Sequence, residues 1–360
     1  MNAPTVKGVR VRAVIVPMSE PHRTASGVIS SSPLVLIDVE TSDGVAGHGI
    51  VFTYTPVALK PIATLAENLG ALLIGESALP RQATEKMLKR FRLLGAHGLI
   101  GMVISGLDMA LWDASARAAG QPLYKHLGGV ARATPAYGAV GYDGVEGSAH
   151  AAERWAKKGM RAVKAKIGYP EVATDIAVIR AMRNAAGPDV AIMVDYNQSL
   201  SVREACERLA RLENEELTWV EEPTIAEDYA GHARIAAASK VPVQAGENWW
   251  GPLEFAKAIE ADAVDLLMPD VMKVFGVTGW VKIAALAQAH NLTVSNHLFP
   301  EISAQLLAVT PTAYWLEYAD WWNPVIATPL QIEGGKAIPS DQPGCGMEWN
   351  EENIARFLAP

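Results

Sequence analysis

Two lysines share one face of a short apolar segment. Lys164 and Lys166 lie in the run VKAKIG at residues 163–168, and side chains two positions apart on a β-strand point to the same side. Adjacent ammonium groups disfavour each other's charged form, which is one route to a neutral amine near pH 7. The pair therefore predicts that Lys166 is a base whose pKa is lowered by Lys164. The plainer alternative is an exposed edge strand that carries two basic side chains.

Three acidic residues end three successive strand-like runs. Asp195 follows VAIMV, Glu221 follows LTWV and Glu247 follows VPVQAG. Carboxylates that meet at one edge of a sheet repel one another and take up protons unless a cation joins them. All-oxygen ligands favour Mg²⁺, with Mn²⁺ as the second choice. Any one of these acids alone would be interpreted as a helix N-cap, but the three together predict a metal site.

The pattern leaves two details of this site open. Glu221 and Glu222 are adjacent in the sequence, so only one of them can face inward, and alternation does not choose between them. Asn197 shares a strand face with Asp195. We expect Asn197 to orient either a metal ligand or the substrate.

A histidine and two further acids end the remaining runs. Asp270 and His297 follow VDLLMP and LTVSN, which we expect to be neighbouring strands. A carboxylate that accepts a hydrogen bond from one imidazole nitrogen fixes the tautomer and raises the basicity of the other nitrogen. His297 is therefore a candidate base. Glu317 ends the last run and is predicted to be a general acid that its neighbours keep protonated.

All these residues belong to one repeating arrangement. Short apolar runs with polar ends recur roughly every 25 residues from Thr134 onward, and helical patterns such as 201–213 and 276–290 separate them. Strands that alternate with helices predict parallel pairing, and eight such units predict a closed (β/α) barrel with its chemistry at the carboxyl ends of the strands. The alternative is a doubly wound open sheet, which normally carries a glycine-rich phosphate turn. The segment GVTG is too short for that turn. The eight runs are TPAYGAV, RAVKAKIG, VAIMVDYNQ, LTWVEEP, VPVQAGE, VDLLMPD, LTVSNH and AYWLEY.

The first part of the chain has a different texture. Residues 6–18 alternate as a strand, and residues 34–50 are typical of a hairpin that turns at Asp43-Gly44. Three helices are predicted to follow, starting near Pro56, Arg81 and Leu99, and the third ends at Gly120.

These patterns divide the chain into two domains. We expect an α+β domain over residues 1–130 and a barrel over residues 131–319. The fold class is therefore α/β.

The composition excludes several classes of function. The chain has 360 residues, 50% of them hydrophobic, and a net charge of −8, which argues against nucleic acid or an anionic membrane as the main partner. Its two cysteines provide no disulfide framework. The amino-terminal residues lack the apolar run of a signal peptide, and no stretch approaches the roughly 20 apolar residues that span a bilayer. We expect a cytoplasmic protein.

Taken together, the motifs resemble the enolase superfamily, and within it the mandelate racemase subgroup. The resemblance covers nearly the whole chain. It implies a barrel of the modified TIM type with a capping domain over residues 1–130 that residues 320–360 complete. It implies Mg²⁺-dependent removal of the α-proton of a small anionic 2-hydroxy acid or sugar acid through an enediolate. It also implies a homo-oligomer, such as an octamer. The motifs that carry it are KAKIGYP, VDYNQS, VEEPT, GENWWGP, MPDVMK and NHLFPEIS, with VALK, KRF and GLDMALWD in the first domain.

The resemblance assigns the metal ligands and decides which of the two adjacent acids is one of them. It implies ligation by Asp195, Glu221 and Glu247, and it chooses Glu221 over Glu222. Asn197 would contact the α-hydroxyl region of the substrate.

The resemblance also assigns the bases. Lys166 would act on one enantiomer, and His297, paired with Asp270, would act on the other. Glu317 would donate a hydrogen bond to the carboxylate as it becomes an enediolate, and Lys164 would bind that carboxylate. Two residues outside the barrel would contact the substrate: His22 and Tyr54.

The sequence departs from the subgroup at the positions that would face the substrate. In the subgroup, a serine at the position of Ala139 contacts the substrate carboxylate. With alanine here, a hydrogen bond worth about 1 kcal/mol is expected to be missing. The loop expected to cover the site, residues 20–26, is polar through His22, Arg23 and Ser26. Ala319 replaces a larger apolar residue before Trp321-Trp322. These changes favour a hydroxylated or larger acid over a phenyl ring.

Three functions follow from these residues. The first is a mandelate racemase-like isomerase, because two bases would act on opposite faces of one carbon. The second is an acid-sugar dehydratase that gives a 2-keto-3-deoxy acid, in which His297 expels a β-hydroxyl group. The third is a barrel that binds an acid without turnover.

Overall fold

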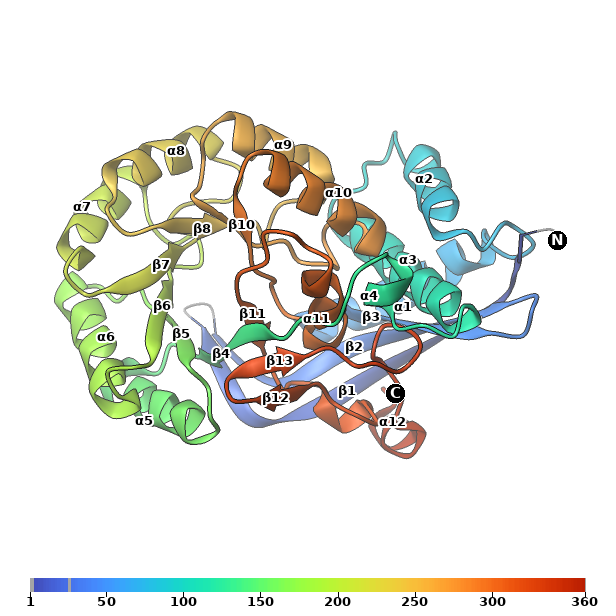
Figure 1. Cartoon of the computed structure of the whole chain (residues 1–360), viewed down its shortest axis with the longest axis horizontal. Helices are drawn as coiled ribbons and strands as arrows, with labels where there is room; N and C mark the ends of the chain where they lie inside the picture. Colours follow the sequence, from blue (N-terminus) through green and yellow to red (C-terminus); the bar gives the residue numbers. More distant parts are fainter. Residues whose placement is uncertain (1–2, 25–26, 360) are drawn as a thin grey trace.

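The computed structural model describes residues 3–24 and 27–359. Figure 1 shows two adjoining parts: an antiparallel sheet with helices packed against it, and a ring in which strands alternate with helices. The last part of the chain returns from the ring to the antiparallel sheet.

The antiparallel sheet consists of β1 (Val6–Thr24), β2 (Gly27–Thr41) and β3 (Ala46–Phe52), in that order. The turn between β2 and β3 contains Gly44 with φ of +83°, as the Asp43-Gly44 signal predicted. β1 is longer than the predicted strand over 6–18. Beyond a register shift between Pro17 and His22 it pairs with β2 again, so residues 20–24 of the expected covering loop are part of the sheet.

Helices α1 (Pro56–Ala71), α2 (Pro80–Arg90), α3 (Leu99–Ala118) and α4 (Leu123–His126) follow, as predicted for the first three. α3 lies directly on β3 because Gly47 and Gly49 have no side chain there. A Cβ atom on Gly49 would lie 2.0 Å from the carbonyl oxygen of Gly106.

The sequence analysis expected no stretch near the roughly 20 apolar residues that span a bilayer, whereas α3 is long and apolar enough by length and composition. α3 passes both tests, but 83% of its apolar window is buried inside the protein. It is the central helix of this core.

The ring is a closed parallel barrel, which confirms the predicted architecture and excludes the open sheet. Strands β4 to β10 pair in sequence order, β11 pairs with β4, and a bridge between Val294 and Ala313 joins the two ends. The strands are β4 (Thr134–Val140), β5 (Ala162–Lys166), β6 (Ala191–Asp195), β7 (Leu217–Glu221), β8 (Val243–Ala245), β9 (Leu266–Leu267), β10 (Thr293–Val294) and β11 (Leu316–Tyr318).

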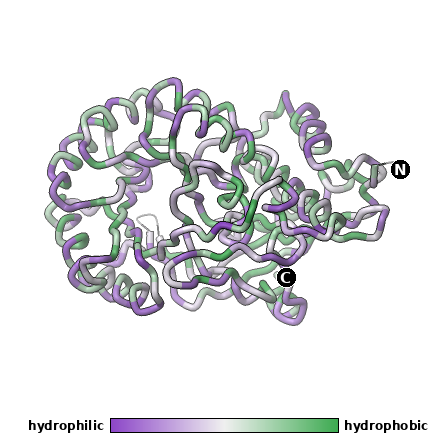
Figure 2. Tube along the Cα trace, in the orientation of Figure 1, coloured by the Kyte–Doolittle hydropathy of each residue, from purple (hydrophilic) through white to green (hydrophobic). Residues whose placement is uncertain are grey.

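The barrel helices lie outside the strands and have amphipathic sequences. α7 begins after Ser201, whose side chain accepts a hydrogen bond from the Glu204 amide, and it buries Leu209 and Leu212 against the barrel. Figure 2 shows hydrophilic residues along the outer turns of these helices. The helices are α5 (Gly144–Lys157), α6 (Val172–Ala186), α7 (Val202–Leu212), α8 (Tyr229–Ala238), α9 (Gly251–Glu260), α10 (Gly276–Ala289) and α11 (Pro300–Ala308).

The carboxyl-terminal segment packs on the antiparallel sheet, as the resemblance implied. Trp349 donates a hydrogen bond to Asp38 at 2.6 Å, and the Ala359 amide donates to the Ala13 carbonyl at 2.9 Å. The segment contains η1 (Asn323–Val325), β12 (Gln331–Glu333), β13 (Lys336–Ile338) and α12 (Glu351–Phe357). β13 also pairs antiparallel with β4.

Candidate active site

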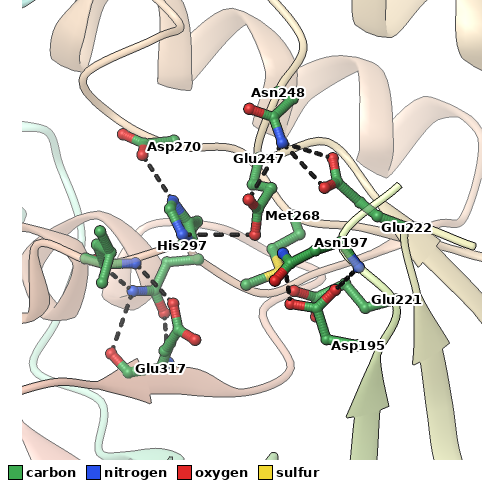
Figure 3. Close-up of polar contacts among 12 residues, drawn as sticks. Asp195, Asn197, Glu221, Glu222, Glu247, Asn248, Met268, Asp270, His297 and Glu317 are labelled. Atoms are coloured by element: carbon green, nitrogen blue, oxygen red, sulfur yellow. Dashed lines mark hydrogen bonds and ion pairs between the residues drawn. The ribbon is translucent and has the colours of Figure 1, made fainter. Parts of the chain in front are cut away.

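Strand register places the predicted site residues side by side at the carboxyl end of the barrel. Lys166 on β5 is the register partner of Asp195 on β6, and Asp195 is the register partner of Glu221 on β7. Because each of these strands ends at that residue, the three side chains emerge at one edge of the mouth. Figure 3 shows the carboxylates converging there with His297 opposite.

The three predicted metal ligands are together in space. One oxygen from each of Asp195, Glu221 and Glu247 lies within 4.8 Å of the others, and all three residues are buried. Glu222 turns away at a positive φ of 37° and accepts hydrogen bonds from Asn248 at 2.9 Å and Gln198 at 3.2 Å. The geometry therefore brings Glu221, and not Glu222, into the cluster.

The electrostatics of this cluster fit a divalent cation. Burial raises the pKa of Glu221, and the charges of Asp195 and Glu247 raise it further against the opposing effect of Lys164. The Oε2 atom of Glu247 is buried and accepts no hydrogen bond from any described residue; His297 Nε2 lies 3.4 Å away. A buried oxygen without a donor, in an all-oxygen set, matches the ligand preference of Mg²⁺ or Mn²⁺.

Further residues orient the carboxylates, and most of them were not found from the sequence. Trp219 and Gln244 donate to Glu221 Oε2 at 3.0 and 3.1 Å. Asn248 donates to Glu247 and is itself held by Lys273 at 2.6 Å. The only signals for these residues were their positions in the sequence. Gln244, Asn248 and Lys273 lie one or three residues from a predicted site residue, and Trp219 shares a strand face with Glu221.

Asn197, which the sequence left between two roles, contacts a predicted ligand. Its backbone amide donates to Asp195 Oδ1 at 2.7 Å, and its side-chain amide donates to Oδ2 at 3.0 Å. Asn197 has a φ of 45°, a left-handed conformation that asparagine tolerates better than most residues. It therefore fixes the orientation of the Asp195 carboxylate.

The two lysines point into the site, but their predicted pKa change was wrong. Lys164 forms ion pairs with Glu221 and, at 3.0 Å, with Glu317, while Lys166 lies 2.8 Å from Asp195. Burial lowers the pKa of Lys166 and Lys164 lowers it too, but Asp195 and Glu247 raise it more, so the net pKa is raised. The prediction counted the neighbouring lysine and omitted the carboxylates from other strands.

His297 and Asp270 form the predicted pair. The Nδ1 atom of His297 lies 2.7 Å from Asp270 Oδ2, and a backbone bridge joins the same two residues. Burial lowers the pKa of His297, but Glu247 and Asp270 raise it above its usual value. With Nδ1 engaged, Nε2 is the nitrogen that remains for chemistry.

Glu317 is in the site, but the prediction that its neighbours keep it protonated was wrong. Its Oε2 atom accepts a hydrogen bond from the Leu298 amide at 2.9 Å. Burial raises its pKa, yet the positive charges of Lys164 and His297 lower it below the usual value. These neighbours therefore favour the ionised carboxylate of Glu317, which accepts hydrogen bonds and does not donate them.

The two candidate bases share one cavity. A cavity of about 30 Å³, which we call the inner cavity, is lined by side chains from both sides of the barrel. Lys166 and His297 both line it, as do Glu317 and the predicted departure Ala139. The remaining lining residues are His22, Val140, Lys164, Leu298 and Trp321.

Comparison with known proteins identifies the family. Residues 6–128 match the amino-terminal domain of the mandelate racemase/muconate lactonizing enzyme family, and residues 147–353 match the enolase C-terminal domain-like family. The chain belongs to the enolase superfamily.

Relatives within the superfamily have different reactions. The 3,6-anhydro-alpha-L-galactonate cycloisomerase of Streptomyces coelicolor is 30% identical over 97% of this chain and 98% of its own. The L-talarate/galactarate dehydratase of Salmonella typhimurium is 30% identical over 96% of this chain and 89% of its own. A solved enolase from Bradyrhizobium, complexed with magnesium and mandelic acid, is 46% identical with a TM-score of 0.94 over the full length of both chains.

In this member of the superfamily the antiparallel sheet covers the inner cavity. His22 on β1 is buried, and burial, with the charge of Lys166, lowers its pKa to about 3, so its ring is neutral. The ring packs on Trp321 with centroids 4.9 Å apart. Tyr54 packs on Phe52 and on Lys273, whose Nζ lies 5.2 Å from its ring centroid. Of the predicted polar loop, Ala25 and Ser26 lie outside the described residues.

Proposed function

We propose that this protein removes the α-proton of a 2-hydroxy carboxylate through an enediolate and returns a proton from the opposite face, as a racemase or epimerase. The single observation that supports this proposal best is that Lys166, at the end of β5, and His297, in the segment after β10, line the same inner cavity. Two bases on opposite faces of one carbon are what a 1,1-proton transfer requires. Asp270 holds the His297 ring through Nδ1, so Nε2 would carry the proton.

The remaining residues have roles in binding and charge stabilisation. We propose Asp195, Glu221 and Glu247 as ligands for Mg²⁺, with Mn²⁺ as a substitute; the cation, when bound, would stabilise negative charge on the substrate carboxylate. Lys164 is buried and its pKa is raised well above the usual value, because Glu221 and Glu317 outweigh the effect of burial. It is therefore a fixed positive charge for the same carboxylate.

Glu317 has a supporting role in this proposal. It accepts from the Leu298 amide and pairs with Lys164, so it holds both groups at the edge of the inner cavity. His22 and Asn197 complete the proposed substrate contacts, with Asn197 acting through Asp195. Tyr54 would act from the capping side, through its contact with Lys273.

Dehydration of a sugar acid is the second candidate. The same bases would serve, with His297 delivering a proton to a leaving β-hydroxyl group. The observation that favours it is the ionic character of the residues next to His22, where Arg23 pairs with Asp143 at 3.2 Å. Curated relatives include a dehydratase of sugar acids.

Proton NMR in D₂O with Mg²⁺ separates these reactions. We expect the α-proton signal of one or more 2-hydroxy acids to disappear while the compound remains a hydroxy acid and its optical rotation decays to zero. Appearance of a 2-keto-3-deoxy acid would identify a dehydratase instead. Full activity in the presence of a chelator would refute the metal site, and absence of exchange with every acid would leave only a binding function.

A further inference from the structure

One carboxylate of the amino-terminal domain reaches a barrel helix. Asp108 lies on α3 and is fully buried, and Figure 1 shows α3 beside α10 at the junction of the two parts. Its Oδ2 atom accepts a hydrogen bond from the Thr278 backbone amide at 3.0 Å. Its Oδ1 atom accepts from the hydroxyls of Thr278 and of Thr84 on α2, each at 2.5 Å. One side chain therefore joins α2 and α3 to the first turn of α10.

This carboxylate supplies a cap that α10 does not have of its own. Phe275, in the cap position, makes no side-chain hydrogen bond to the helix and has a left-handed φ of 65°, which is strained for a bulky residue. A carboxylate at this end satisfies free backbone amides and meets the positive end of the helix dipole. Gly276 permits the approach, because a Cβ atom there would lie 2.4 Å from Asp108 Oδ2. Asp108 therefore takes the place of an N-cap side chain.

The segment that leads into α10 begins with a residue of the active site. Asp270 holds the His297 ring, with Oδ2 2.7 Å from Nδ1 (Figure 3). In the turn that follows, the Asp270 carbonyl accepts a hydrogen bond from the Val274 amide at 3.0 Å. The Val271 carbonyl accepts one from the Gly276 amide, also at 3.0 Å. Because these bonds span the turn, a shift at the start of α10 should displace Asp270 as well.

This turn has little room to adjust. The side chains of Val271, Met272 and Val274 are fully buried. A Cβ atom at Gly279 would lie 1.5 Å from the Val274 carbonyl oxygen, so the turn lies directly against α10. Close-packed interiors transmit strain instead of absorbing it. The position of α10 and the position of Asp270 are therefore linked.

A second buried aspartate on α3 provides a comparison. Asp113 is also fully buried, and it accepts hydrogen bonds from the backbone amides of His48 at 2.9 Å and Cys345 at 2.5 Å. It also pairs with Arg117 at 2.5 Å. These contacts hold α3 to β3 and to the carboxyl-terminal segment. Asp113 therefore matches Asp108 in burial and in acceptor contacts, but its contacts with the described residues lead away from the active site.

We propose that Asp108 is a positioning residue for the Asp270–His297 pair. It fixes the start of α10, and through the turn before α10 it fixes the carboxylate that holds the His297 ring. The inference rests on the proposed function, in which His297 is the base on one face of the substrate. Lys166, the base on the other face, lies on β5, so Asp108 should affect one face only.

Exchange of the α-proton in D₂O, measured separately for the two enantiomers of the best 2-hydroxy acid, tests this role. Asp108→Asn keeps the volume of the side chain but removes its charge and one acceptor. Exchange through His297 should then fall by about tenfold or more, while exchange through Lys166 stays within about twofold. Asp113→Asn is the matched control and should leave the ratio of the two rates unchanged. Equal losses from both enantiomers in Asp108→Asn, or the same change of ratio in Asp113→Asn, would overturn the proposal.

A milder pair of variants covers the case in which Asp108→Asn does not fold. Thr278→Ser keeps the hydroxyl that donates to Asp108, whereas Thr278→Val keeps the shape of the side chain without it. Serine should preserve the ratio of the two exchange rates, and valine should lower exchange through His297 selectively. A ratio that valine leaves unchanged would overturn the proposal.

A measurement without substrate separates this role from the proposed function. In protein labelled with ¹⁵N in its histidine rings, the His297 signals report the hydrogen bond to Asp270, and their absence in His297→Gln assigns them. Asp108→Asn should shift these signals, and Asp113→Asn should leave them in place. Exchange with no acid at all would refute the proposed function, but the shift would still support the positioning role. Unshifted His297 signals in Asp108→Asn would overturn that role whatever the activity.

Discussion

The Nδ1 atom of His297 lies 2.7 Å from Oδ2 of Asp270, and the two residues are also joined through their backbones. The carboxylate therefore determines which imidazole nitrogen faces the inner cavity. The backbone bridge keeps the two Cα positions together whatever side chains they carry, so this contact can be removed without moving the residues.

Asp270→Asn should impair only one face of the proposed reaction. An amide cannot stabilise the imidazolium as a carboxylate does, so exchange of the α-proton through His297 should fall by about a hundredfold or more. Exchange through Lys166 should persist. The measurement is deuterium incorporation from each enantiomer separately, and equal losses from both would contradict independent roles.

Lys166→Met should give the opposite selectivity. Methionine has a similar length but no proton acceptor, so exchange from the enantiomer that Lys166 serves should disappear while exchange through His297 remains. Normal exchange from both enantiomers would show that Lys166 has another role. The two variants together should divide the enantiomers between them.

Glu247→Ala should abolish cation binding in a protein that stays folded. Loss of an outer-shell partner costs about 10–100-fold in metal affinity, and loss of a ligand should cost more. Titration with Mn²⁺ followed by electron paramagnetic resonance measures this without any substrate. Glu260→Ala, at an exposed position on α9, is the control. Unchanged Mn²⁺ affinity in Glu247→Ala would remove Glu247 from the ligand set.

The contacts of the Asp38 carboxylate should make the stability of the folded protein depend on pH. Burial alone would raise the pKa of Asp38, but hydrogen bonds from His48 and Trp349 and the charge of Arg12 lower it from 3.8 to about 2. A carboxyl group whose pKa is lower in the folded state than in the unfolded state stabilises the fold at pH values above the unfolded-state pKa. This stabilisation is lost as the pH falls toward 2.

Thermal unfolding of Asp38→Asn measures this contribution. The difference in Tm from the unchanged protein should be largest above about pH 5 and should shrink as the pH falls through 4 and 3. A difference that does not vary with pH would show that the carboxylate charge contributes nothing.

Gly49→Ala should destabilise the protein through the packing of α3 on β3. The added Cβ atom would lie 2.0 Å from the Gly106 carbonyl oxygen, and overpacking of a core costs about 1–3 kcal/mol or more. Gly8→Ala on β1 is the control, because its nearest neighbour is the end of the Glu40 side chain at 3.9 Å. Denaturant unfolding should separate the two variants.

The barrel and most of its site residues were predictable because apolar runs with polar ends recur at regular intervals along the sequence. Asp195, Glu221 and Glu247 follow apolar runs of similar length, so their meeting at one edge requires only parallel pairing. The hairpin turn at Asp43-Gly44 was predictable from local chemistry in the same way.

The pKa shifts were not predictable, because they depend on charges from strands that are distant in sequence. Lys166 titrates according to Asp195 and Glu247 as well as its neighbour Lys164. Likewise, β1 extends to Thr24 because it pairs with β2 again after a register shift. No local sequence pattern indicates this extension.

The hydrogen bond from the Ala359 amide to the Ala13 carbonyl joins two segments that the whole barrel separates in sequence. During synthesis on a ribosome, β1 emerges before the barrel, but this contact and the one from Trp349 to Asp38 form only after the whole barrel has left the exit tunnel. The amino-terminal sheet therefore spends most of translation with part of its surface uncovered. An insertion next to Ala359 would disturb that late contact more than one in a barrel loop.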